Sequence, residues 1–283
     1  MWLVLVGILS VQLGAAVAKT LFDEIPPTGI VWLRLVTSAA VLLAWTRPRL
    51  RGRSREDWLV VVGFGASLAL MNWAIYQSFA RIPLGIAVTI EFVGPLSLAV
   101  WGSRRPRDLV WVGLAGVGVL LLGLDGAELT VAGVVFALVA GAAWAAYILL
   151  SGHTGRRWEG LDGLAVASLV ATAMLAPASW FTAGSLLLDP RVLLLGALVG
   201  LLSSVVPYSC ELVALRSLAP AVFGILMSLE PAAAALAGAV VVGELLGPVQ
   251  YAAIACVVVA SVGATRAASA ATAPDAPTTT VRD

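Results

Sequence analysis

Long apolar segments alternate with short polar breaks along almost the whole sequence. Each segment is about 20 residues long and lacks strict apolar–polar alternation, which favours membrane-spanning helices over the strands of a membrane barrel. We predict ten spanning helices, at residues 2–20, 28–46, 58–80, 84–102, 109–124, 130–151, 163–183, 192–213, 220–242 and 250–266. We expect the first to remain as a span, because no basic region precedes it as in a cleaved signal peptide.

Composition narrows the class of protein. Of the 283 residues, 60% are hydrophobic and only 12% are charged, whereas a soluble domain carries about 25% charged residues. This excludes a soluble enzyme, a secreted disulfide scaffold, a disordered protein and a nucleic-acid binder, and makes the lipid bilayer the expected environment. Cys210 and Cys256 fall in apolar segments and are interpreted as small hydrophobic residues. Residues 267–283, rich in Ala, Thr and Pro, are predicted to form a disordered cytoplasmic tail.

The arginines are distributed unequally between the two sides of the predicted bundle. One side carries Arg47, Arg49, Arg51, Arg53, Arg55, Arg104, Arg105, Arg107, Arg156, Arg157, Arg216, Arg266 and Arg282. The loops on the other side carry Arg81 and Arg191. The positive-inside rule therefore places both termini in the cytoplasm, and an even number of spans agrees with that placement.

The second half of the sequence resembles the first. YQSFARIPLGIAVTIEFVGP, at 76–95, parallels ELVALRSLAPAVFGILMSLEP, at 211–231, and the segments 108–123 and 248–263 also align. Five spans per unit is an odd number, so the second unit must enter the membrane inverted. Inverted repeats are typical of alternating-access transporters; chance similarity between apolar segments is the alternative. We therefore predict an all-α membrane protein of two five-helix repeats, 1–125 and 126–266, followed by the tail.

Five charged residues lie within or just inside the predicted spans: Lys19, Arg34, Glu91, Glu211 and Glu230. An ionised side chain near the bilayer centre costs at least about 2.5–3.5 kcal/mol, so each should face the protein interior and have a partner. We assign structural charge pairing to Lys19, Arg34 and Glu211. The candidate partners of Arg34 are Glu91, Asp23 and Glu24.

Glu91 and Glu230 are the acids with the strongest indication of function. Pro95 follows Glu91 by one turn and removes a backbone donor, which frees a carbonyl near Glu91. Pro231 directly follows Glu230. A carboxylate beside a broken helix can hold an ammonium group or a proton. The alternative for Glu91 is a permanent structural bridge to Lys19 or Arg34.

Uncharged polar residues provide further candidates for the lining of a binding site: Gln12, Asn72, Tyr76, Tyr147 and Tyr208. Asn72 and Tyr76 are four residues apart and share a helix face. Such a lining suits a polar metabolite, although part of it is expected to serve helix–helix hydrogen bonding. The only histidine, His153, is in a predicted cytoplasmic loop, so no catalytic triad is expected in the membrane, and no metal site or cofactor is predicted.

These features together resemble the drug/metabolite transporter superfamily, whose repeat is the EamA domain. SLEPAAAALAGAVVVGELL, at 228–246, is similar to the Pro-then-Gly-Glu signature of that domain, with Gly243 and Glu244 before the last span. The first half has Ser103-Arg104-Arg105 at the corresponding place. Five segments resemble the threonine and homoserine exporter branch of this superfamily: SVQLGAAVAKTLF (10–22), RIPLGIAVTIEFVGPL (81–96), SRRPRDLVW (103–111), AGAAWAAYILLSG (140–152) and FGILMSLEPA (223–232).

The resemblance implies a multi-pass carrier of the bacterial inner membrane that exports amino acids, with protons as the expected coupling ion. It also implies a central cavity lined by both repeats, for which Gln12, Asn72, Tyr76, Glu91, Tyr147, Tyr208 and Glu230 are the candidates. The predicted mechanism is alternating access, with Glu91 binding the substrate ammonium or a proton. The alternatives are a carrier of the same fold for another metabolite or drug, and a membrane scaffold that transports nothing.

Overall fold

The computed structural model describes residues 1–103, 108–124, 129–215, 218 and 220–272, and every regular element in these ranges is helical. The α-helices are α1 (Trp2–Thr20), α2 (Pro27–Thr46), α3 (Arg55–Phe79), α4 (Leu84–Glu91), α5 (Val93–Ser103), α6 (Leu109–Leu124), α7 (Val131–Gly155), α8 (Asp162–Ala183), α9 (Pro190–Gly200), α10 (Val206–Leu215), α11 (Pro220–Met227), α12 (Glu230–Ala237) and α13 (Pro248–Thr272). A 3₁₀ turn, η2 (Gly184–Leu188), and two π-helical turns, η3 (Leu201–Val205) and η4 (Gly238–Val242), complete the set.

The helices agree closely with the ten spans predicted from the sequence. Eight helical stretches are long and apolar enough to cross a membrane, and Leu109–Leu122 and Pro190–Val205 are shorter apolar helices. Three predicted spans, 84–102, 192–213 and 220–242, are each divided into two α-helices. The predicted tail, 267–283, begins within α13, and residues 273–283 lie outside the described part of the chain.

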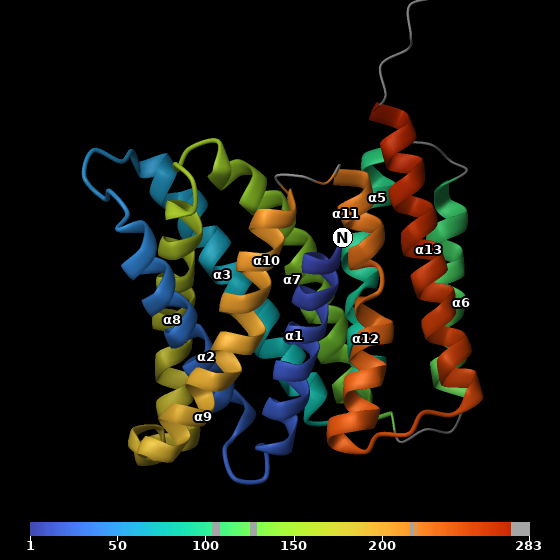
Figure 1. Ribbon diagram of the computed structural model, residues 1–283, viewed down its shortest axis with the longest axis horizontal. Coiled ribbons are helices and arrows are strands. Elements are labelled where there is room, and N and C mark those ends of the chain that lie inside the picture. The colour runs from blue at the N-terminus through green and yellow to red at the C-terminus, as the bar shows by residue number, and fades with distance from the viewer. Residues whose placement is uncertain (104–107, 125–128, 216–217, 219, 273–283) are drawn as a thin grey trace, which may run out of the picture.

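Helices from the first half of the chain pack against helices from the second half. α3 packs on α7, α2 on α8, α1 on α10 and α6 on α13. Figure 1 shows α2 and α8 toward one end of the bundle, α6 and α13 at the other, and α1 between them. A central apolar core, which includes the buried residues Ile30, Leu84 and Ile90, joins these helices. The two halves therefore share one interior.

Glycines allow two helices to approach closely in the middle of the bundle. A Cβ atom added to Gly141 of α7 would lie 2.5 Å from the carbonyl oxygen of Glu91, and one added to Gly94 would collide with the carbonyl of Gly141. Because these two glycines have no side chain, the backbones of α4 and α5 can pack directly against the backbone of α7.

Two groups of ion pairs tie the halves together at opposite ends of the bundle. At one end, Arg157, in the connection after α7, pairs with Glu56 (2.6 Å) and Asp57 (3.1 Å) at the start of α3. The hydrogen bond to Asp57 and the charge of Glu56 raise the pKa of the Arg157 guanidinium. At the other end, Lys19 pairs with Glu244, which follows η4.

Candidate functional site

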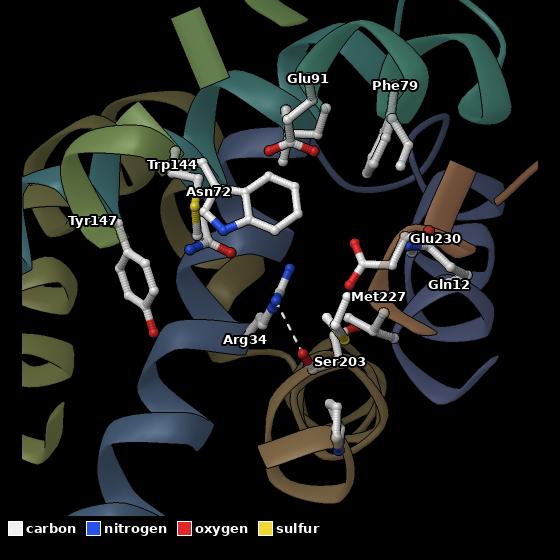
Figure 2. A pocket seen from close by; sticks show the side chains of 16 residues that line it. Gln12, Arg34, Asn72, Phe79, Glu91, Trp144, Tyr147, Ser203, Met227 and Glu230 are labelled. Carbon is white, nitrogen blue, oxygen red and sulfur yellow. Dashed lines mark hydrogen bonds between the residues drawn. The ribbon is translucent and has the colours of Figure 1, made fainter. Parts of the chain in front are cut away.

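A cavity of about 180 Å³ lies between the halves of the chain and contains most of the buried charge in the described residues. Its walls come from α1, α2, α3, α4, α7, α11 and α12, together with the irregular turn η3 and the start of α10. The polar side chains at its surface are Gln12, Arg34, Asn72, Glu91, Tyr147, Ser203 and Glu230. Figure 2 shows Glu91, Arg34 and Glu230 converging on one open space from three different elements.

Glu91 is the last residue of α4 and is 8% exposed. Its carboxylate has no hydrogen bond or ion pair within 4 Å among the described residues, although it interacts electrostatically with Arg34. Figure 2 shows the carboxylate pointing into the cavity. A buried carboxylate without a close cation is costly, so this position is suited to a cationic group or a proton brought from outside.

Arg34 enters the cavity from the middle of α2, and the protein holds its guanidinium on one side. Nη2 donates to the carbonyl of Ser203 (3.0 Å), Nε to Oγ of Ser204 (3.3 Å), and Nη1 to the hydroxyl of Tyr76 (3.5 Å). The guanidinium also lies 5.7 Å from the centre of the Tyr76 ring. All these partners are uncharged, and no carboxylate of the described residues lies within 4 Å of Arg34.

Three prolines explain why the helices are irregular around the cavity. Pro95, Pro207 and Pro231 each lack the amide hydrogen that would bond the carbonyl four residues earlier. Those earlier residues are Glu91, Ser203 and Met227, and all three line the cavity. At Ser203 the carbonyl lies in the π-helical turn η3 and accepts a hydrogen bond from Arg34. Irregular turns of this kind are common at functional sites.

The remaining polar groups lie on both sides of the acids. Glu230 begins α12 and is 8% exposed, and Gln12 of α1 lies beside it in Figure 2. Asn72 of α3 donates to the carbonyl of Leu68 (2.9 Å), which leaves its amide oxygen for the cavity. Trp144 of α7 forms an apolar wall and packs edge-on against Phe92.

The structure distributes the predicted site residues unevenly. Gln12, Asn72, Glu91, Tyr147 and Glu230 line the cavity. Tyr76 is fully buried behind Arg34 and supports it, rather than contributing to the cavity surface. The side chains of Tyr208 and Glu211 lie outside the described part of the structure.

The two predicted structural cations differ in their surroundings. Lys19 pairs with Glu244 and is not part of the cavity. Arg34 has none of its three candidate carboxylate partners within ion-pair distance, and Glu24 instead pairs with Arg191 (3.2 Å). Sequence reasoning therefore missed the position of Arg34 in the cavity. It also missed Met227 and Pro207 as part of the lining. The available signal was the position of Pro207 and Pro231, which follow Ser203 and Met227 by four residues.

Comparison with known proteins places the chain in a family. The model of the EamA-like transporter family matches residues 131–266. The threonine/homoserine exporter RhtA of Escherichia coli K12 is 41% identical over 93% of this chain and 90% of its own length. The RhtA of Salmonella typhimurium LT2 is 40% identical over 92% of this chain and 89% of its own length. The chain belongs to the EamA family, in the RhtA branch. This EamA protein is also 32% identical, over 78% of each chain, to the uncharacterized transporter YwfM of Bacillus subtilis.

The fold of this EamA protein also occurs among solved structures. One crystal structure superposes with a TM-score of 0.63 over 95% of this chain and 96% of that chain, at 20% sequence identity. At that identity the likeness concerns the fold alone. Membership in a transporter family, helices long enough to span a membrane and a cavity between the halves are mutually consistent, because a membrane transporter needs both spanning helices and an internal binding space.

Proposed function

We propose that this protein is a secondary active exporter of small polar amino acids, of the threonine and homoserine type, in the bacterial inner membrane. The observation that carries the proposal is the convergence of Glu91, Arg34 and Glu230 on one small cavity between the halves. A zwitterion brings one positive and one negative group, and the cavity offers acids and a cation. The names of the RhtA relatives support the choice of amino acid.

The size of the cavity favours a small cargo. Its volume of about 180 Å³ is below the roughly 300–1,000 Å³ of typical sites for drug-sized ligands. Its charged lining is also poorly suited to an apolar drug, because such a cargo offers no group that could bind the buried charges of Arg34 and Glu91. These two features favour a polar metabolite over a drug within the same fold.

The proposed mechanism is alternating access between two inverted repeats, 1–125 and 126–266, with both termini and the tail in the cytoplasm. The pairing of first-half helices with second-half helices supports it, because motion of one unit against the other would open the cavity toward either side. Glu91 is proposed to bind the substrate ammonium, or the proton that exchanges for it, and Glu230 is the second acid. The Arg-rich loops support the orientation.

Transport in vesicles tests the proposal. Inverted membrane vesicles that contain the protein should take up labelled threonine and homoserine faster than vesicles without it, and a pH gradient, acidic inside, should increase the uptake. A panel with apolar drugs, purines and larger amino acids would identify a different cargo. Absence of transport for every compound, with the protein present in the membrane, would favour the scaffold alternative and contradict the proposal.

A further inference from the structure

The buried guanidinium of Arg34 is held by the protein, but no carboxylate of the described residues lies within 4 Å of it. Its three hydrogen bonds within the described part of the chain go to a backbone carbonyl and two hydroxyl groups, and Arg34 is 9% exposed. A guanidinium has five N–H donors, so two remain available after these contacts. Because Arg34 lines the cavity, a ligand there can accept from these donors.

The positive charge of Arg34 indicates which chemical group of a ligand would bind in the cavity. A buried cation without a close counter-ion is costly, and a planar guanidinium matches a carboxylate through two parallel hydrogen bonds. The protein does not supply that carboxylate within 4 Å among its described residues. Figure 2 shows open space between Arg34 and the two acids, with Glu91 and Glu230 bordering it from different helices.

We infer that Arg34 is the residue that binds the α-carboxylate of the substrate, so that the cavity selects compounds that carry a free carboxylate beside an ammonium group. The inference rests on the proposed function and specifies the chemistry of the same site. The carboxylate occupies the remaining N–H donors of Arg34, and the ammonium faces Glu91 and Glu230 across the cavity. The side chain of the substrate then lies against Asn72 and Trp144.

The surroundings of Arg34 are suited to positioning such an anchor. Pro207 provides no amide hydrogen for the carbonyl of Ser203, which accepts from Nη2 of Arg34 and fixes one end of the guanidinium. The hydroxyl of Tyr76 contacts the other terminal nitrogen. Because the guanidinium is fixed before the substrate binds, little conformational entropy is lost when the carboxylate docks.

Two matched ligands test the inference on the wild-type protein. L-Threonine and L-threoninamide share the ammonium and the hydroxyl group, but the amide lacks the carboxylate charge. Isothermal titration of the purified, detergent-solubilised protein should give an affinity at least about 30-fold weaker for the amide, since an unpaired partner of a buried charge pair is strongly penalised. Equal affinity for the two ligands would overturn the inference and leave the proposed export of amino acids intact.

Substitutions of Arg34 provide a second test of the inference. Arg34→Gln should lose threonine affinity by a similar factor and should no longer distinguish threonine from threoninamide. Arg34→Lys should restore part of the preference, because it keeps the charge without the planar fork. The control, Arg191→Gln, removes an exposed arginine outside the cavity and should behave as wild type. A preference for threonine that survives Arg34→Gln would also overturn the inference.

Each outcome is distinguishable from failure of the proposed function. If wild-type vesicles transport no amino acid and the protein binds neither ligand, the proposed function itself is wrong. If Arg34→Gln does not fold, the comparison of the two ligands on the wild-type protein decides the question alone.

Discussion

Lys19 and Glu244 form an ion pair that joins the end of α1 to the segment after η4, although they belong to opposite halves of the chain. The pair is connected to the start of α4 on both sides. Nζ of Lys19 donates to the carbonyl of Ile82 (2.7 Å), and Oε2 of Glu244 accepts from the amide of Leu84 (2.8 Å). Both charged side chains are 16% exposed. This latch, as we call these four residues, closes the bundle at the end where the arginine distribution predicts the outer side.

Breaking the latch should expose the cavity from outside. With alternating access, α1 and η4 must separate at this end, and Glu244→Gln removes the charge that holds Lys19. We expect a cysteine at Ala15, which lines the cavity, to react about 10-fold faster with an impermeant thiol reagent in whole cells, since a charge-assisted contact contributes about 1.5–3 kcal/mol. Cys210 and Cys256 would be replaced beforehand.

The matched control for the latch is Glu24→Gln. It breaks the exposed pair between Glu24 and Arg191, which also joins the two halves of the chain, and an exposed pair contributes little. Its labelling rate should equal that of the parent protein. A Glu244→Gln protein that labels no faster than this control would show that the latch does not restrict access.

Glu91→Gln should abolish most threonine export while the protein still inserts in the membrane. The amide is nearly the same size, but it can neither take up a proton nor balance an ammonium group in a buried site. We expect the rate to fall at least about 30-fold, from the cost of an unpaired buried charge. Threonine efflux from preloaded cells, normalised to the amount of protein in the membrane, measures the effect.

The control for Glu91 is Glu159→Gln, which changes an exposed acid in the connection between α7 and α8. Its efflux should match that of wild type. Wild-type efflux from a well-expressed Glu91→Gln protein would remove Glu91 from the proposed mechanism.

The helices could be predicted from the sequence because the length and apolar composition of each segment indicate that it spans a membrane. The break at Glu91 and Pro95 could also be predicted, because the two residues lie about one turn apart in the same predicted span. The partners of charged residues were different: nothing near Lys19 in the sequence indicates Glu244, because their contact depends on the packing of α1 against the second half. Tyr76 shares a helix face with Asn72, but Arg34 from α2 lies over its hydroxyl. Which charges pair, and which face the cavity, is determined only by tertiary packing.

Gly141→Ala should destabilise the centre of the bundle. The added Cβ would lie 2.5 Å from the carbonyl oxygen of Glu91, and a backbone atom cannot move aside as a flexible side chain would. Overpacking of this kind costs about 1–3 kcal/mol, so the thermal unfolding midpoint in detergent should fall. Gly152→Ala is the control on the same helix, because no atom lies within 4 Å of its added Cβ. Equal midpoints for the two variants would show that α4 and α7 can separate without cost.

Pro207→Ala should weaken threonine binding although residue 207 contributes no charge. The new amide hydrogen can bond the carbonyl of Ser203 within the helix, and that carbonyl is then no longer free to hold Nη2 of Arg34. Loss of one hydrogen bond to a charged group corresponds to about 1.5 kcal/mol, or roughly a 10-fold weaker affinity in titration calorimetry. Pro177→Ala is the matched control, since Pro177 lies inside α8 and does not line the cavity. If both alanine variants bind threonine as tightly as wild type, the proline does not position Arg34. If only Pro207→Ala loses affinity, the irregular turn η3 is part of the binding site.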